Sequence, residues 1–295
     1  MPHTALDALA NTTASFAQLI NGNHPVLEQP MGIRTIRHPL DDRLPAMLRS
    51  GQPVHGIFNG LPCPGIVEMC AYAGFDCIVI DNEHGAADLE TTEHMLRAAR
   101  ASGITPIVRC FEPDIARVLD MGASGVQIPM VDTAEQARAL VQRVRYPGQG
   151  QRGSAFSSRA AGYGAFGGAP HTQRSNEGIA LIVMLETPQA VANAAAIAAV
   201  DGVDALFVGP NDLSHTMGHG SDWACAPVQA AIESAIRAAV AAGKCAGTLA
   251  LTPQDAAKLA GWGANYLLNV TTSIFTKALR DAARPGEHEA VEVAY

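Results

Sequence analysis

Eight short apolar runs alternate with longer alanine-rich segments along residues 54–270, and this alternation restricts the possible folds more than any other feature. The runs are apolar on both faces, which is typical of strands in a parallel sheet that helices cover. The predicted strands are residues 54–59, 76–81, 105–110, 125–131, 180–186, 204–209, 245–251 and 265–270. The predicted helices between them include residues 89–103, 133–146 and 227–243.

Eight strands that alternate with helices predict an α/β fold of the (β/α)8 TIM barrel type. A doubly wound open sheet is the alternative, but it normally has fewer strands, and no GxGxxG turn follows the first strand here. Residues 1–41 lack the repeating pattern; residues 5–20 predict one amphipathic helix, and irregular chain follows it. We therefore divide the chain into an N-terminal extension, residues 1–41, and a barrel domain, residues 42–295.

The composition favours a protein that acts on a small molecule. Hydrophobic residues make up 48% of the chain and charged residues 16%, which is enough apolar material for a large core. The net charge of −8 argues against nucleic acid or anionic membranes as main partners. The six cysteines have no CxxC spacing, and no apolar stretch is long enough to cross a membrane. We expect a reduced, cytoplasmic setting.

A long segment, residues 147–178, interrupts the pattern between the fourth and fifth predicted strands. It is rich in Gly, Ser and Arg. We expect it to be a loop on the barrel face that carries the active-site loops. A loop of this length is usually a lid, a binding loop or an interface element.

Catalytic groups of such barrels gather at the C-terminal ends of the strands. The titratable residues at these positions are Asp81, Glu83, His84, Arg109, Glu186 and Asp212. Several acids at one rim repel one another unless a cation lies among them, and Mg²⁺ or Mn²⁺ takes one or two protein carboxylates and leaves its other positions to water and substrate. We predict that Glu186 and Asp212 bind the metal directly, while Asp81 and Glu83 hold water molecules bound to it.

Each of these residues also has a purely structural interpretation. Glu186 is followed by Thr187 and Pro188, which begin a helix well, so its carboxylate could serve as a helix cap or in an ion pair. His84 is either a polar loop residue or a general base. Arg109 lies in an apolar strand, and if it is buried it must face a carboxylate or a ligand oxyanion.

Two histidines four residues apart, His215 and His219, have a spacing that could suggest a metal pair. Gly218 and Gly220 make a stable helix improbable at this position, so we predict a loop. Lys244 lies at the beginning of the seventh predicted strand, directly before residue 245, and no lysine lies near the C-terminal strand ends. A Schiff-base mechanism is therefore not expected.

Several ordered motifs, among them AGFDCIVIDNEHG, PIVRCFEPD, YPGQGQRG, LETPQAV and GVDALFVGPNDLS, resemble the HpcH/HpaI class II pyruvate-dependent aldolases. The resemblance covers about residues 43–282. It implies that Glu186 and Asp212 bind a divalent ion, Mg²⁺ or Mn²⁺ with Co²⁺ as a further option. It also implies that His84 is the base and that Arg109 contacts the keto oxygen of pyruvate. Backbone amides around Asn211 and Asp212 would receive the pyruvate carboxylate.

Asp120 matches an aspartate that pairs with the catalytic histidine in this family. It falls near the end of a predicted helix, at the opposite face of its own barrel, and can reach a His84 only in a neighbouring subunit. This agrees with the homohexamer that the resemblance implies.

The resemblance implies reversible cleavage of a 4-hydroxy-2-oxo acid to pyruvate and an aldehyde through a pyruvate enolate. The alternatives are an oxaloacetate decarboxylase, a synthase that uses the same enolate, and a non-catalytic barrel that binds a keto acid. Met184 and Thr271 stand where relatives often have a glutamine and an aspartate. Both changes make the rim less polar and affect the expected substrate more than the metal chemistry.

Overall fold

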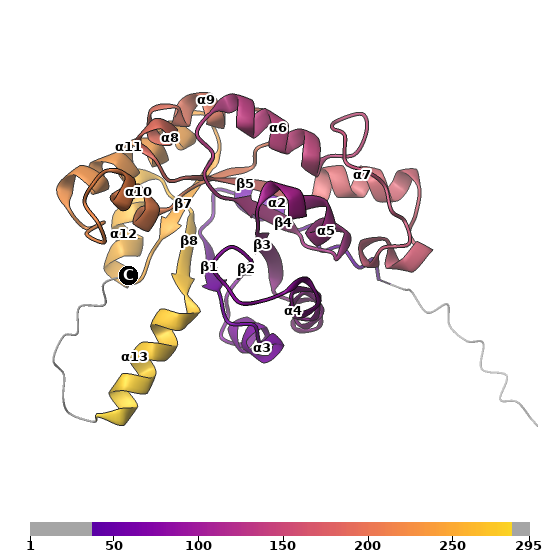
Figure 1. Ribbon diagram of the computed structural model, residues 1–295, viewed down its shortest axis with the longest axis horizontal. Helices are drawn as coiled ribbons and strands as arrows, with labels where there is room; N and C mark the ends of the chain where they lie inside the picture. Colours follow the sequence, from indigo (N-terminus) through magenta and orange to yellow (C-terminus); the bar gives the residue numbers. More distant parts are fainter. Residues whose placement is uncertain (1–36, 285–295) are drawn as a thin grey trace, which may run out of the picture. The chain divides into compact units, whose positions relative to one another are not determined.

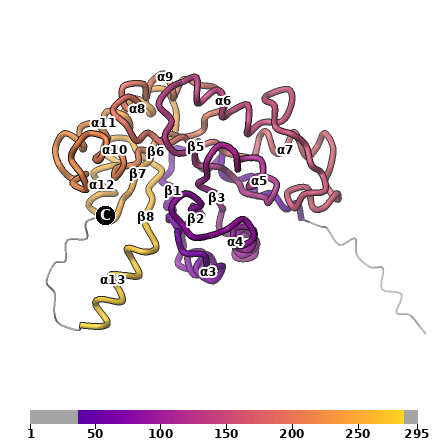
Figure 2. The backbone as a smooth tube through the Cα atoms, viewed as in Figure 1, coloured from indigo at the N-terminus to yellow at the C-terminus, as the bar shows by residue number. Residues whose placement is uncertain are grey.

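The computed structural model describes residues 37–284, which contain a closed barrel of eight parallel strands (Figure 1). The strands are β1 (Val54–Asn59), β2 (Cys77–Asp81), β3 (Thr105–Arg109), β4 (Gly125–Ile128), β5 (Ala180–Leu185), β6 (Ala205–Val208), β7 (Cys245–Leu249) and β8 (Tyr266–Val270). They follow one another around the barrel in sequence order. Figure 2 shows β8 beside β1, where Val54 pairs with Tyr266 and closes the sheet.

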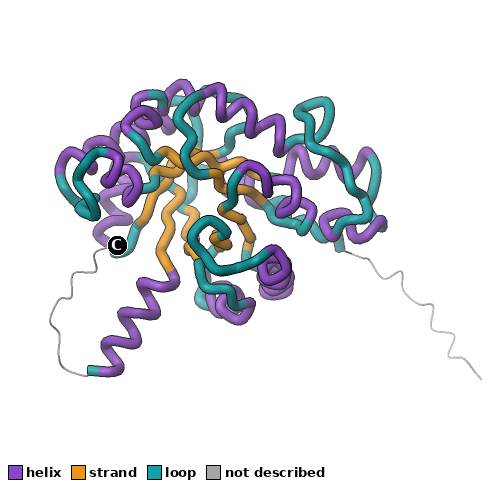
Figure 3. Tube along the Cα trace, in the orientation of Figure 1, coloured by secondary structure: helices purple, strands orange, loops and turns teal. Residues whose placement is uncertain are grey.

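Helices alternate with the strands and lie around the outside of the barrel (Figure 3). The α-helices are α2 (Leu44–Arg49), α3 (Pro64–Tyr72), α4 (Leu89–Ser102), α5 (Ile115–Asp120), α6 (Ala134–Val144), α7 (Ala169–Gly178), α8 (Pro188–Ala192), α9 (Ala194–Ala198), α10 (Pro210–Thr216), α11 (Ala226–Ala241), α12 (Pro253–Trp262) and α13 (Thr271–Ala283). Two short 3₁₀ helices are η1 (Glu112–Asp114) and η2 (Arg159–Gly164).

The predicted TIM barrel is confirmed, and each of the eight observed strands falls inside a predicted one. The strands are almost continuously buried because one face of each points into the barrel and the other packs under helices. The three predicted helices correspond to α4, α6 and α11, with ends that differ by at most two residues.

Apolar side chains fill the barrel interior from its N-terminal end. Leu44 and Leu48 of α2 belong to the same buried cluster as interior residues such as Val79 and Phe207. A Cβ added to Gly125 at the start of β4 would lie 2.8 Å from Leu44 Cδ2, so α2 packs tightly against this end. The open space for a ligand is therefore expected at the other end, where the strands terminate.

The expectation for residues 147–178 is wrong in its placement. This segment follows α6, contains η2 and α7, and leads into the start of β5. A connection that leaves a helix and enters the next strand lies at the N-terminal end of the strands, whereas active-site loops follow strands. The segment is also partly helical rather than a plain loop.

The last described helix, α13, begins directly after β8 and carries exposed apolar side chains. Figure 1 shows it running outward from the end of β8. Ile274 is 39% exposed and Leu279 is 70% exposed. An amphipathic helix normally buries its apolar side chains against the rest of the protein, so the exposed Ile274 and Leu279 give α13 an apolar surface.

The predicted helix over residues 5–20 and most of the N-terminal extension lie outside the described residues, and the boundary at residue 41 stays a prediction. Leu40, near the end of that extension, is buried in the outer core. Within residues 37–284, none of the helices combines the length and the apolar character that spanning a membrane requires.

Candidate active site

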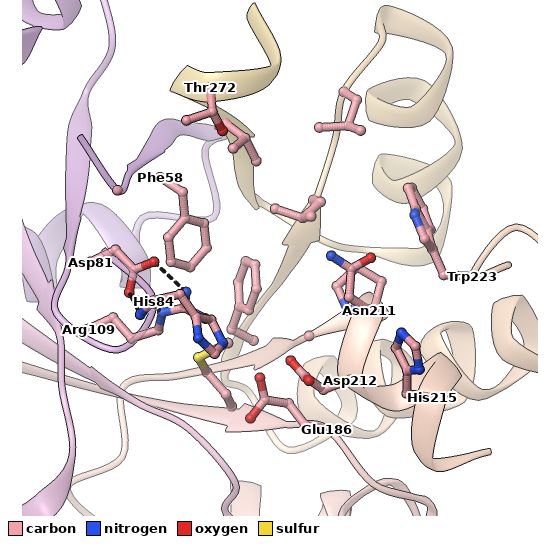
Figure 4. Close-up of a pocket in the computed structure, with 18 residues that line it drawn as sticks. Phe58, Asp81, His84, Arg109, Glu186, Asn211, Asp212, His215, Trp223 and Thr272 are labelled. Atoms are coloured by element: carbon pink, nitrogen blue, oxygen red, sulfur yellow. Dashed lines mark hydrogen bonds and ion pairs between the residues drawn. The ribbon is translucent and has the colours of Figure 1, made fainter. Parts of the chain in front are cut away.

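A cavity of about 440 Å³ lies at the C-terminal ends of the strands (Figure 4). The predicted site residues that line it are Asp81, His84, Arg109, Glu186, Asn211 and Asp212. They come from β2 and the turn after it, from β3, from the residue after β5 and from α10, which are far apart in sequence. The barrel therefore brings these predicted residues to one rim.

A buried ion pair between Asp81 and Arg109 forms one wall of the cavity. Arg109 donates from Nε to Asp81 Oδ1 (2.8 Å) and from Nη2 to Asp81 Oδ2 (2.6 Å). Burial disfavours the charged form of Asp81, but the hydrogen bonds and charge of Arg109 outweigh it and hold the pKa of this carboxyl below its ordinary value. Arg109 also lies 3.1 Å from Glu83 and stacks over the Phe58 ring. The guanidinium is thus fixed in one orientation.

The same aspartate shapes the turn that carries His84. Asp81 Oδ1 accepts backbone N–H groups of Glu83 (3.1 Å) and His84 (3.3 Å). A Cβ on Gly85 would lie 2.1 Å from the Asp81 carbonyl oxygen, so the turn requires glycine there. The His84 side chain is 64% exposed at the rim, with Nε2 4.0 Å from Glu83 Oε1. The ring is therefore accessible both to solvent and to a ligand in the cavity.

Glu186 is buried at the floor of the cavity, directly after β5, with 1% of its surface exposed. Its Oε2 accepts the backbone N–H of Met130 (2.7 Å). Met130 has φ 57°, a left-handed conformation that costs a non-glycine residue free energy. In this conformation its backbone N–H donates to the Glu186 carboxylate. Burial, followed by the nearby carboxylates of Asp212 and Glu83, raises the pKa of Glu186 to about 7.

Gly209, at the end of β6, leaves the room that Glu186 occupies. A Cβ on Gly209 would lie 2.6 Å from Glu186 Oε1 and 2.7 Å from its Cγ. The Thr216 hydroxyl donates to the Glu186 backbone carbonyl (2.9 Å) and ties α10 to this position. The Met130 amide therefore fixes the Glu186 carboxylate, while Thr216 fixes the Glu186 backbone.

Glu186 and Asp212 fit the requirements of a divalent cation. Figure 4 shows both carboxylates turned into the same part of the cavity. A bound cation would relieve the burial and like-charge repulsion that raise the Glu186 pKa. Among residues 37–284 there is no group of three or more His, Cys, Asp or Glu side chains arranged to hold a metal. Two carboxylates with water and substrate completing the shell is the pattern that Mg²⁺ prefers.

Two further residues lie away from the cavity. Asp120, the last residue of α5, accepts a hydrogen bond from Arg152 Nη2 (2.6 Å) and is not part of the cavity lining. Lys244 donates from Nζ to the Val203 carbonyl oxygen (2.7 Å) near the N-terminal ends of β6 and β7. None of the described residues that line the cavity is a lysine.

Several functional positions escaped the sequence reasoning. Gly209 leaves room for the Glu186 side chain, and the Met130 amide binds its carboxylate. Of these two residues only Gly209, as a glycine at the end of the sixth predicted strand, has a sequence signal for such a role. His215, predicted to lie in a loop, is on α10 and lines the cavity. Trp223 lines it from the segment between α10 and α11, where sequence alone gives no signal of proximity.

The raised pKa of Glu186 predicts a pH-dependent stability of the metal-free protein. The native carboxyl keeps its proton up to about pH 7, whereas the unfolded one releases it near 4.5, so the free energy of unfolding falls as pH rises between these values. Complete ionisation should cost about 3 kcal/mol relative to Glu186→Gln. Urea unfolding with a chelator, at several pH values from 5 to 8, measures this difference. Parallel curves for the two proteins would contradict the prediction.

Comparison with known proteins gives one consistent family. The family model of the HpcH/HpaI aldolase/citrate lyase family matches residues 55–273. The chain is 40% identical to the hydroxypyruvate/pyruvate aldolase of Delftia acidovorans, over 81% of this chain and 88% of that protein. It is 39% identical to the 2-keto-3-deoxy-L-rhamnonate aldolase of Salmonella gallinarum, over 79% and 88% of the two chains.

A solved structure supports the same assignment. An HpcH/HpaI aldolase/citrate lyase family protein from Burkholderia cenocepacia superposes with a TM-score of 0.78 at 31% identity, covering 82% of this chain and 98% of the other. Sequence and fold thus agree over the whole barrel. The chain belongs to the HpcH/HpaI aldolase/citrate lyase family and is a carbon–carbon lyase.

Proposed function

We propose that this enzyme is a divalent-metal-dependent pyruvate aldolase, which reversibly cleaves a 4-hydroxy-2-oxo acid to pyruvate and an aldehyde. The observation that carries the proposal is the set of groups around one cavity: the buried carboxylates of Glu186 and Asp212, the fixed guanidinium of Arg109 and the exposed imidazole of His84. The described lining holds no lysine for a Schiff base, so the charge of an enolate must be stabilised electrostatically.

Glu186 and Asp212 would hold the cation, with Mg²⁺, Mn²⁺ or Co²⁺ as candidates and with Asp81 and Glu83 proposed to orient its water molecules. When bound, the ion supplies Lewis acidity that stabilises negative charge developing on the keto oxygen of pyruvate. Met130 and Gly209 prepare the site by fixing the Glu186 carboxylate before any ligand arrives. Preorganisation of this kind lowers the reorganisation that binding costs.

Arg109 would bind the keto oxygen and neutralise the charge that forms there. Its orientation is set by Asp81, and a guanidinium has five N–H donors, so it can contact a ligand while it keeps the carboxylate pair. The amides of Asn211 and Asp212, in the first turn of α10, would receive the pyruvate carboxylate, because first-turn amides have no partner within their helix.

His84 would move the proton. In the cleavage direction it takes the proton of the C4 hydroxyl, the electron pair of that O–H bond forms the aldehyde carbonyl, and the C3–C4 bond breaks with its pair going to C3. In the synthetic direction the imidazole accepts a C3 proton of pyruvate, leaving the enolate. The turn built by Asp81 and Gly85 presents the ring at the cavity rim for both steps.

The test of the proposed function uses two measurements on the full-length protein. Pyruvate in D₂O should exchange its C3 protons when Mg²⁺ or Mn²⁺ is present and not after chelation, as followed by mass spectrometry. Addition of an aldehyde should then give a 4-hydroxy-2-oxo acid. Absence of metal-dependent exchange would reject the proposal.

Arg109→Lys should lower kcat/KM for pyruvate proton exchange by roughly 10- to 100-fold, because it removes charge-assisted hydrogen bonds that each contribute about 1.5–3 kcal/mol. Lysine cannot hold the two oxygens of Asp81 in the same geometry. Arg143→Lys, an exposed ion pair with Glu112, is the matched control and should change the rate by less than about threefold. Equal effects of the two substitutions would contradict the role of Arg109.

We further propose that the enzyme is a homo-oligomer, a homohexamer in which Asp120 of one subunit serves His84 of another. Two observations support this. Asp120 is a partly exposed carboxylate held by buried Arg152 at a distance from its own cavity, and α13 carries unpartnered apolar surface at Ile274 and Leu279. A second copy covering α13 would bury this surface and gain about 25 cal/mol per Å².

Ile274→Asp combined with Leu279→Asp should shift the mass in solution toward the 30.8 kDa of one chain, as measured by light scattering after gel filtration. A charge on an apolar interface is left without its hydration. Thr276→Asp, on the polar side of the same helix, is the control and should leave the mass unchanged. A wild-type protein that is a fully active monomer would reject both the oligomer and the role of Asp120.

We propose a cytoplasmic location for the enzyme. All six cysteines lie among the described residues and are free, and four of them are buried as small apolar side chains. Burial alone raises the pKa of Cys70 to about 11, which keeps that thiol protonated and unreactive.

A further inference from the structure

The cavity has two chemically different sides, and the chemistry described above uses one of them. Charged side chains from β2, β3, α10 and the end of β5 occupy that side. The other side is lined mainly by apolar side chains from the end of β7 and the residues after it, the end of β8 and the segment between α10 and α11: Leu249, Leu251, Val270 and Trp223. His215 and Thr272 are the polar residues that border it. Figure 4 shows Trp223 across the cavity from Asp81 and Arg109.

The side chains of the apolar side are not completely buried by packing within the barrel. Leu249, Leu251, Val270 and Trp223 are all only partly buried, whereas Leu268, two residues before Val270 in β8, is completely buried. Part of their apolar surface therefore faces the cavity. Exposure of such a surface to water is unfavourable, and an apolar group of a ligand that covers it gains binding free energy.

The charges of the cavity disfavour an acceptor that carries a carboxylate. Among the described lining residues the one guanidinium is Arg109, which already contacts Asp81 and Glu83, and none is a lysine. Asp81, Glu186 and Asp212 supply negative charge. With a cation between Glu186 and Asp212 and with Arg109 paired to Asp81, the remaining cationic partners that the lining could offer a second carboxylate are the imidazoles of His84 and His215. A carboxylate on the acceptor would therefore lose hydration here without meeting a guanidinium or an ammonium group.

We infer that Leu249, Leu251, Val270 and Trp223 form the acceptor subsite, and that the preferred acceptor is an uncharged aldehyde with an apolar chain or ring. This inference rests on the proposed function, since pyruvate must occupy the charged side. In the aldol step C3 of the enolate bonds to the aldehyde carbon, the carbonyl π pair moves to the aldehyde oxygen, and that oxygen takes the proton that His84 removed from C3 of pyruvate. The remaining part of the aldehyde then lies on the apolar surface.

The test compares four-carbon aldehydes with the full-length enzyme, Mg²⁺ and pyruvate. Butanal should give a kcat/KM at least about tenfold above those of 4-oxobutanoate and erythrose, which replace apolar surface by a carboxylate or hydroxyls. From propanal to pentanal, each methylene should raise kcat/KM by about fourfold. Equal or higher values for 4-oxobutanoate or erythrose would overturn the inference.

A charge placed in the subsite gives a second, independent measurement. Leu251→Arg should move the ratio of kcat/KM for butanal over 4-oxobutanoate by at least about tenfold toward the carboxylated aldehyde. Val240→Arg adds the same charge at a residue of α11 that is 41% exposed and outside the cavity lining, and should leave the ratio unchanged. An identical ratio in the two variants would contradict the position of the subsite.

Proton exchange separates failure of this inference from failure of the proposed function. Exchange at C3 of pyruvate requires no aldehyde, so its absence in the wild-type enzyme would reject the proposed metal-dependent enolate chemistry. Normal exchange with no preference for apolar acceptors would reject the acceptor subsite alone. For each variant the aldol rate is divided by its own exchange rate, which removes any effect on pyruvate binding.

Discussion

Glu186→Ala is expected to abolish metal-dependent exchange of the C3 protons of pyruvate, with a loss of at least about a thousandfold. Glu186 is one of the two carboxylates proposed to hold the cation, and its alanine variant would leave Asp212 alone to bind it. The lost stabilisation of charge at the keto oxygen is of the size that removal of a preorganised electrostatic group produces, about 3–4 kcal/mol or more. Mass spectrometry of pyruvate in D₂O with excess Mg²⁺ measures the loss.

The matched control is Glu233→Ala on α11, where Glu233 forms an exposed pair with Arg237 at 2.8 Å. Exposed pairs of this type contribute about 0–1 kcal/mol, so exchange should stay within about twofold of the wild-type rate. The Glu186 variant should remain folded, because removing a buried carboxyl with a raised pKa removes an unfavourable charge as well as a hydrogen bond. Exchange at the wild-type rate in Glu186→Ala would remove this residue from the site.

Gly209→Ala should lower the same exchange rate by at least about a hundredfold, although it replaces no titratable residue. The added methyl would lie 2.6 Å from Glu186 Oε1 and 2.7 Å from Cγ, well inside van der Waals contact, so the carboxylate must move. A displacement of about 1 Å at a catalytic group commonly costs 100-fold in rate. Titration with Mg²⁺ should show that the apparent affinity for the metal falls in parallel.

Gly261→Ala provides the control for the loss of a glycine. Gly261 lies within α12, and a Cβ there would meet nothing within 4 Å. This substitution should leave the rate unchanged and raise stability by up to about 1 kcal/mol, since alanine favours a helix over glycine. If Gly209→Ala kept full activity, the tight fit between Gly209 and Glu186 would have no functional role.

The barrel could be predicted from the sequence because its strands obey a strong physical constraint. Runs such as ALIVMLE must bury both faces, and eight of them in alternation with helices leave few arrangements. The C-terminal strand ends then follow from topology, and with them the positions of Asp81, Arg109 and Glu186. These residues could be grouped into one site because the fold brings the C-terminal strand ends to one rim, which no single motif indicates.

Other parts of the site depend on tertiary contacts that no local pattern encodes. The left-handed backbone of Met130 is imposed by its surroundings and has no signal in the run IPMVD. Trp223 reaches the cavity from an irregular segment, and such segments have no periodicity to indicate direction. Arg109 was expected to face a carboxylate or a ligand oxyanion, and only the pairing of β2 with β3 identifies that carboxylate as Asp81. The misplaced segment 147–178 could have been assigned correctly from the helix that precedes it.

The filling of the barrel interior by Leu44 and Leu48 of α2 has a kinetic consequence. Within residues 37–284, packed side chains close that end of the barrel, so the reactants share the opening at the opposite end. Aldehyde and pyruvate enter, and product leaves, through the same opening. A product that dissociates slowly is therefore expected to block the entry of the next pyruvate.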